Sequence, residues 1–181
     1  MIKIIILLLV VYFIFKMIQT YKRSNFLFSK TQKASKEFVF NIFNASDNNE
    51  ELVMNFSKIQ FECDDNAIAF KALEMIHSSN NQLREKAQEL YFHNCYLSCV
   101  VGEIRVFLFS NLDKNITKED LFAVQDSVNM SHMQKALLED FILKARDLKK
   151  LYNKYKKNET LDSDENEAIK ILIEKEMLLR K

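Results

Sequence analysis

Proline is absent from this chain of 181 residues, and glycine occurs only once, at Gly102. These two residues normally make up about 5% and 7% of a protein and build its turns, hairpins and bulges. Tight hairpins in particular favour Asn-Gly or Asp-Gly. The shortage argues against a sheet-rich fold, whereas helices joined by polar loops need neither residue. One glycine also cannot build a glycine-rich phosphate loop, which argues against P-loop and dinucleotide-binding enzymes.

The chain also has few cysteines and almost no net charge. The three cysteines, Cys63, Cys95 and Cys99, cannot all pair within one chain. They do not form the disulfide framework of a small secreted domain, and they suit a reducing compartment better. The formal net charge is +1, so the overall charge gives no argument for a nucleic-acid partner.

The N-terminal segment contains the longest apolar run of the chain. Residues 4–15 read IIILLLVVYFIF, with Lys3 before them and Lys16 after them. With its apolar neighbours the run has about 17 residues and as a helix spans roughly 26 Å, near the lower limit for crossing a membrane. We therefore predict a transmembrane anchor over residues 1–21. The side chains assigned to the membrane interior are Ile4, Leu7, Leu8, Val11 and Phe15.

Two other interpretations of this segment remain open. A cleaved signal peptide needs small residues after its apolar core, but the first alanine of the chain is Ala34. A buried core helix would also be apolar. An uncleaved anchor agrees best with the length of the run and with its lysine flanks.

The charges around the run predict the orientation of the anchor. Six cations follow it before the first acid, Glu37: Lys16, Lys22, Arg23, Lys30, Lys33 and Lys36. The positive-inside rule places such a flank in the cytoplasm, and these cations would also be attracted to anionic lipids. We expect a single-pass protein with a basic juxtamembrane segment and helix over residues 22–45 and a cytoplasmic domain. The alternative is a signal anchor that carries the domain outside.

The rest of the chain, residues 46–181, predicts an all-α domain, an irregular bundle of about five to seven helices. Polar breaks separate the helices at residues 46–51, 78–81 and 110–115 and around residues 158–166. Several residues have the character of helix caps. They are Asn48 or Asn49, Asp64 with Asp65, Thr117 with Asp120, and Asp162 with Glu165.

Residues 82–109 form the most apolar stretch after the anchor and predict a central core helix. Glu103 and Arg105 within it argue against a second membrane span, because a central arginine costs about 2.5–3.5 kcal/mol on insertion. Propensity alone would also permit a strand over residues 104–109, but no partner strand is visible.

No group of residues predicts a catalytic or metal site. Cys95 and Cys99 are one helical turn apart and could offer two thiolates, but structural zinc needs four ligands and His93 would not share their face. We expect these cysteines to pack in the core. A metal or thiol protein using Cys95 and Cys99 remains the less favoured alternative.

Two further groups are incomplete. Glu74 and His77 match half of a di-iron carboxylate–histidine pattern, but the second pair is missing, so His77 is expected to cap a helix C-terminus. Asp126, Ser127 and His132 are the only close Asp, Ser and His, and they suit capping better than catalysis. We therefore expect no cofactor and no enzymatic activity.

Residues 144–157 are rich in lysine and include Tyr152 and Tyr155. A basic helix with aromatic residues can bind an anionic membrane or nucleic acid. The candidate anion-binding or partner-binding residues are Lys149, Lys150, Lys154 and Lys157. Against this, the acidic run that follows would neutralise the helix and make it an ordinary solvated face. In an anchored domain, lipid headgroups are favoured over nucleic acid.

Together these features predict a membrane-tethered helical interaction or scaffold protein. Its partners would be membrane lipid at the N-terminal helix and a protein, which is either another chain or a second copy. The alternative is a peripheral binder of anionic lipid or nucleic acid through residues 144–157.

Overall fold

The computed structural model describes residues 29–128 and 135–181. The predicted anchor over residues 1–21 lies outside these ranges, as do Lys16, Lys22, Arg23 and His132. The chain divides into two units, Met1–Phe38 and Val39–Lys181. In the described part of the first unit, residues 29–38 are helical, and Lys30 and Lys33 are exposed on them.

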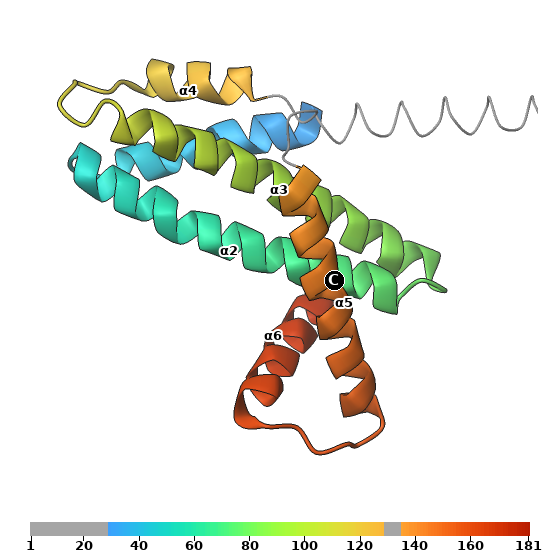
Figure 1. The fold of residues 1–181 in the computed structure, drawn as a ribbon. Helices are drawn as coiled ribbons and strands as arrows, with labels where there is room; N and C mark the ends of the chain where they lie inside the picture. Colours follow the sequence, from blue (N-terminus) through green and yellow to red (C-terminus); the bar gives the residue numbers. More distant parts are fainter. Residues whose placement is uncertain (1–28, 129–134) are drawn as a thin grey trace, which may run out of the picture. The chain divides into compact units, whose positions relative to one another are not determined.

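The described residues contain six helices and no strand. A helix over residues 29–44 is followed by α2 (Asn49–Ile76), α3 (Asn81–Phe109), α4 (Lys118–Ser127), α5 (Lys135–Lys156) and α6 (Ser163–Leu179). Figure 1 shows these elements along the chain. The predicted all-α bundle of five to seven helices is confirmed. In the described ranges, no helix carries an apolar stretch long enough to cross a membrane.

Most helices begin where a short polar side chain caps the backbone. The Asn48 carboxamide accepts a hydrogen bond from the Glu51 amide at 2.9 Å, and Asn80 does the same at the start of α3. Capping boxes of Thr117 with Asp120 and of Asp162 with Glu165 begin α4 and α6. These caps confirm the predicted helix starts, because each satisfies amides that the first turn leaves without partners.

The predicted helix start at Asp64 and Asp65 is wrong, because α2 runs unbroken through both residues. Asp64 accepts a hydrogen bond from the Ser98 hydroxyl of α3 at 2.5 Å instead of capping a helix. Asp65 is exposed. With no glycine or proline nearby, nothing in the backbone stops the helix. The alternative strand over residues 104–109 is also wrong, since these residues belong to α3.

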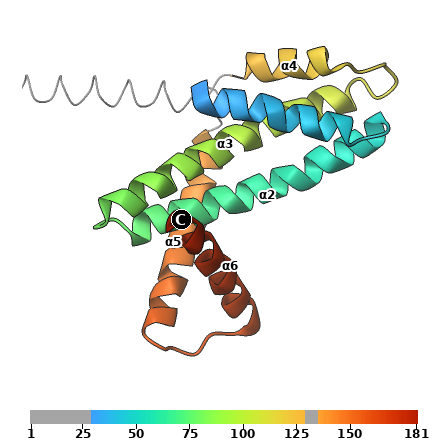
Figure 2. The same cartoon turned by 180° about the vertical axis from the view of Figure 1, so that it is seen from behind.

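Helices α2 and α3 form a long antiparallel hairpin, visible from both sides in Figures 1 and 2. Polar contacts align the two helices along their length. Asp64 bonds to Ser98, Gln60 accepts a hydrogen bond from Arg105, and Asn49 donates to two carbonyls of the loop after α3 at 2.8 Å. Buried apolar side chains fill one side of this hairpin, among them Phe56, Val100, Ile104 and Leu108.

Helices α5 and α6 pack on the part of the hairpin nearest its turn. Phe141 of α5 packs with Ala67 of α2 and Cys95 of α3. A larger cluster joins all four helices: Ala69, Phe70, Ala72, Leu73, Leu83, Ala87, Ala145, Tyr152, Ile169, Leu172 and Leu179. The α5–α6 pair is therefore held on the hairpin by apolar packing.

Candidate functional site

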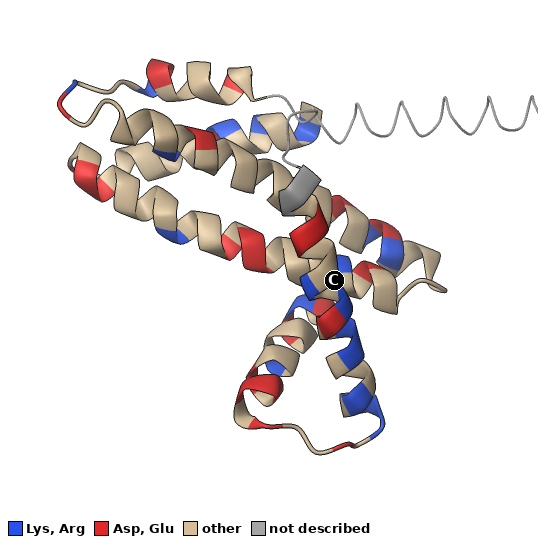
Figure 3. Ribbon diagram, in the orientation of Figure 1, with Lys and Arg blue, Asp and Glu red and all other residues tan. Residues whose placement is uncertain are grey.

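The predicted basic site lies on the second half of α5, where Figure 3 shows cations facing the acidic first turn of α6. Lys150, Lys154 and Lys157 are spaced so that they share one face of the helix. Lys149 points about 100° away from Lys150. The structure thus places three of the four predicted lysines together and one apart.

Each of these three lysines has a carboxylate partner. Lys150 pairs with Asp147 at 2.8 Å, Lys154 with Glu165 at 3.0 Å, and Lys157 lies 4.0 Å from Glu159. These pairs are mostly exposed, so each contributes little to stability. They do neutralise most of the positive charge that the site would offer to an anion.

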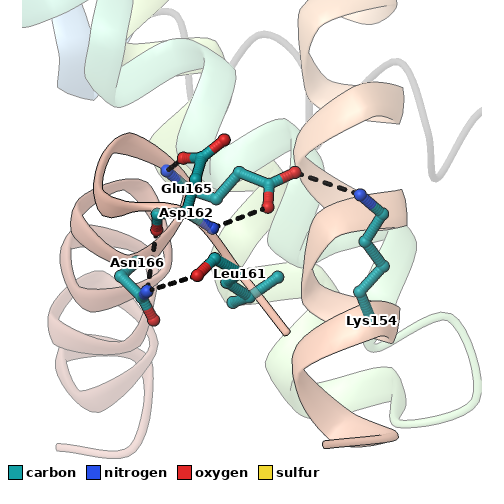
Figure 4. A network of polar contacts seen from close by, with 5 residues as sticks. All are labelled: Lys154, Leu161, Asp162, Glu165 and Asn166. Atoms are coloured by element: carbon teal, nitrogen blue, oxygen red, sulfur yellow. Dashed lines mark hydrogen bonds and ion pairs between the residues drawn. The ribbon is translucent and has the colours of Figure 1, made fainter. Parts of the chain in front are cut away.

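Lys154 acts as a link between α5 and α6 (Figure 4). It donates to Oε1 of Glu165, whose other oxygen accepts a hydrogen bond from the Asp162 amide at 3.2 Å. Asp162 in turn accepts from the Glu165 amide at 2.8 Å. Asn166 completes the network by donating to the carbonyls of Leu161 and Asp162. Lys154 therefore supports the start of α6.

Beside this network lies an open hollow of about 540 Å³ between α2, α5 and α6. Ile68, Leu148 and Leu151 contribute its apolar surface, and its charged lining combines three lysines with two acids: Lys144, Lys150, Lys154, Asp147 and Glu165. Lys144 also pairs with Asp140 at 2.8 Å. The hollow is a shallow surface of mixed charge.

A buried polar contact fastens α6 to α2 and α5. Glu176 is 7% exposed and accepts hydrogen bonds from the Tyr152 hydroxyl at 3.3 Å and from Arg180 at 2.7 Å. Nε2 of His77, the residue that caps the end of α2, lies 3.1 Å from Glu176 Oε1. Among the described residues, Nε2 of His77 has no hydrogen-bond partner, so His77 lies beside the carboxylate without a hydrogen bond to it.

The surroundings of Glu176 decide its ionisation. Burial by itself raises the pKa of Glu176, but the Arg180 hydrogen bond, the charges of His77 and Arg180 and the Tyr152 hydroxyl outweigh it. The pKa of Glu176 is therefore lowered from its ordinary value of 4.5. The contact is a charged one at neutral pH.

Cys63 of α2 and Cys95 of α3 are buried, Cys99 is partly buried, and Cys95 packs with Phe141 of α5. Burial, strengthened by the charge of Asp64, raises the pKa of Cys63 and Cys95 to about 12 and that of Cys99 to about 11. Such thiols stay protonated at neutral pH and are poor nucleophiles. Within the described ranges, no three His, Cys, Asp or Glu residues lie close enough to hold a metal ion.

The other predicted groups have separate structural partners. Glu74 pairs with Lys71 at 2.7 Å, whereas His77 contacts Glu176. Ser127 donates to the carbonyl of Val124 at 2.6 Å at the end of α4.

Sequence reasoning missed an exposed apolar surface on the hairpin, which we call the open face. Four of its side chains are more than half exposed: Met54 (70%), Phe61 (69%), Val106 (64%) and Phe109 (57%). Gln60 of α2 and Arg105 of α3 contact each other between the two helices. Phe61 is the residue after Gln60, and Val106 is the residue after Arg105. Because both helices are right-handed and run antiparallel, that step turns both side chains to the same side of the hairpin.

The open face continues a surface that α5 covers elsewhere. Along α3 the stripe consists of Cys95, Cys99, Gly102, Val106 and Phe109, spaced four and three residues apart. Cys95 is 2% exposed beneath Phe141 of α5, whereas Val106 stands in solvent three turns later. In Figure 1, α5 crosses only part of the hairpin. As far as residues 29–128 and 135–181 are concerned, the same side of the hairpin is thus packed at one end and uncovered at the other.

The only glycine of the chain lies within the open face. A glycine inside a helix costs about 0.5–1 kcal/mol relative to alanine. A Cβ atom at Gly102 would meet only the Gln60 side-chain amide, at 3.4 Å, which is an ordinary contact distance. The packing of the described residues therefore does not require glycine at this position.

No protein-family model matches this chain, and neither a curated protein nor a solved structure matches it. The function must be argued from the surfaces described above.

Proposed function

We propose that this protein is a membrane-tethered helical interaction module, without catalytic activity, which binds a protein helix on the open face of α2 and α3. The observation that carries the proposal is the exposure of four large apolar side chains on one side of the hairpin. Their apolar surface is on the order of 400 Å², a size at which exposed patches are often functional.

The partner is a helix because the same side of the hairpin already accepts one. Phe141 of α5 packs over Ala67 and Cys95, and the stripe of α3 continues from there into the open face. The exposed side chains of α2 and α3 form two rows that lie side by side. The groove between two such rows accepts the ridge of another helix better than it accepts an extended strand. Gly102 lowers the surface at its centre and allows a helix to approach closely.

The tether is proposed from the sequence. The apolar run over residues 4–15 ends in a cluster of cations, which favours an anchor with the domain on the cytoplasmic side. Catalysis by a thiolate is disfavoured by the raised pKa of all three cysteines. The lysines of α5 support an anion-binding role less well, since Lys150, Lys154 and Lys157 have carboxylates beside them.

Site-specific photocrosslinking in membranes tests the proposal. A photoreactive phenylalanine analogue is placed at Val106 in the full-length chain, and at Ile171 of α6 as a matched control with 46% exposure. We expect a protein adduct at position 106 only, and expect Phe61→Lys to abolish it. Equal adducts at both positions, or none at either, would overturn the proposal.

A further inference from the structure

We infer that the partner helix of the open face is basic, with lysine or arginine residues on both sides of its apolar stripe. This inference rests on the proposed function and names the chemistry of the partner. The observation behind it is a set of exposed carboxylates that flank the apolar side chains on both helices of the hairpin. We call this set the acidic rim, and its members are Glu62 and Asp65 of α2 and Glu103 of α3.

The acidic rim lies along both outer edges of the open face. Glu62 and Asp65 follow Phe61 by one and four residues, which turns them by about 100° and about 40° from Phe61, toward the edge away from α3. Glu103 precedes Val106 by three residues and lies about 60° from it, toward the edge away from α2. The two rows of apolar side chains therefore have carboxylates on either side.

The edges carry a net negative charge. Lys58 is exposed among the rim residues of α2, so three acids stand against one lysine. Arg105 lies between the two helices, where it donates to Gln60. A cationic partner is attracted to such edges, whereas a second copy or an anionic lipid surface would bring like charges together.

The size of the open face makes these charges important. Its apolar surface is about half of the ~800 Å² that each partner contributes to a standard interface, so apolar burial alone gives a weak contact. Complementary charges at the edges add specificity and a faster rate of association. The contact should therefore depend on ionic strength.

The apolar rows of the open face continue beneath a helix of the same chain. On α2, Met54, Phe61 and Ile68 are seven residues apart and lie on one stripe. Ile68 packs against the cluster that contains Phe141 of α5 and Cys95 of α3. The helix α5 therefore shows what kind of helix this side of the hairpin accepts.

In α5 the apolar contact is combined with a cation. Lys144 lies one turn after Phe141 and lines the hollow between α2, α5 and α6. The hydrogen bond and the charge of Asp140 raise the pKa of Lys144, and the charges of Asp64 and Asp65 on α2 add to this effect. One member of the acidic rim thus already faces a lysine of α5. The other two members stand beside the part of the stripe that no described helix covers.

Crosslinking of two model helices tests the inference. The full-length, membrane-bound chain carries the photoreactive residue at Val106 and is mixed with one of two synthetic amphipathic helices. Both helices have the same leucine stripe, which is flanked by lysines in one and by glutamates in the other. We expect the lysine-flanked helix to give at least a tenfold higher yield of adduct. That yield should fall as the ionic strength rises from about 0.05 M to about 0.5 M.

Charge variants provide the matched controls. Glu62→Lys with Glu103→Lys should reverse the preference between the two helices, because it makes the edges basic. Lys58→Glu should raise the yield with the lysine-flanked helix. Glu174→Lys, which changes an exposed acid of α6, should alter neither yield. Each of these side chains is exposed, so circular dichroism should show unchanged helical content.

The outcomes separate this inference from the proposed function. Equal yields with the two helices, including none with either, would overturn a basic partner. A preference that Glu62→Lys with Glu103→Lys leaves unchanged would do the same. The proposed function would still stand if Val106 gives an adduct with a cellular protein and Phe61→Lys abolishes it. Absence of that cellular adduct would overturn both.

Discussion

Removal of the Glu176 carboxylate should loosen α6 from the rest of the domain. Glu176 is buried and joins three elements, because it contacts His77 after α2, Tyr152 of α5 and Arg180 after α6. Glu176→Ala leaves the buried Tyr152 hydroxyl without its acceptor and removes the carboxylate beside His77. A buried hydroxyl is costly to leave unsatisfied.

The expected loss of stability follows from the groups that contact Glu176. Hydrogen bonds to a charged group contribute about 1.5–3 kcal/mol each, and the loss of one member of a buried pair costs about 3–5 kcal/mol. The Arg180 side chain is 59% exposed, so water replaces the hydrogen bond that Arg180 loses, and this loss adds little to the cost. We therefore expect Glu176→Ala to lower the free energy of unfolding by about 2–4 kcal/mol, and Glu176→Gln by less.

Urea denaturation followed by circular dichroism measures this change at pH 7. The matched control is Glu174→Ala, an exposed residue of the same helix, which should change stability by no more than about 0.5 kcal/mol. Hydrogen exchange should show the loss first in the amides of α6. A Glu176→Ala variant as stable as the control would refute the reasoning.

The pH dependence gives the same contact a second signature. Because the pKa of Glu176 is lowered in the folded state, its contribution is fully present above its ordinary value of 4.5. That contribution is lost as the pH falls from 4.5 through the folded-state pKa. The natural chain should lose stability more steeply than Glu176→Gln over this range.

Four further results are expected. Cys95 should react with a maleimide at pH 7 at least 100-fold more slowly in the folded chain than in urea, because burial keeps its thiol protonated; an equal rate would contradict this. Asp162→Ala should cost about 1 kcal/mol in thermal unfolding by removing the cap of α6. Gly102→Ala should stabilise an isolated monomer by about 0.5 kcal/mol in urea denaturation, and a clear loss would show that the Gln60 contact is tighter than it appears. Charge reversal of Lys150 and Lys154 should leave flotation with anionic liposomes unchanged; reduced flotation would favour the basic face of α5 as the binding surface.

Features that depend on neighbouring residues were predictable from the sequence. The pairs Thr117–Asp120 and Asp162–Glu165 cap amides within three residues of themselves, so their spacing alone identified two helix starts. Asn48 was one of the two residues expected to cap α2. The cap at Asn80 was not predicted, although the break over residues 78–81 was. His77 was likewise expected at a helix end, where the structure places it.

Features that depend on distant residues were not predictable. Asp64 resembles a cap, but its partner Ser98 lies 34 residues away. Glu176 has no local signal, because its buried environment is made by α2 and α5. The stripe from Cys95 to Phe109 has the spacing of a core helix at every position. Only the path of α5 decides that one end is buried and the other is exposed, and no local pattern contains that path.

Domain sidedness in intact cells tests the central claim of a membrane-tethered module most directly. A single cysteine is placed at Asp113, an exposed loop residue, in a background without the native cysteines, and is labelled with a membrane-impermeant maleimide before and after permeabilisation. The account predicts that the chain sediments with membranes and is labelled only after permeabilisation. Labelling of intact cells, or recovery of the chain in the soluble fraction, would contradict it.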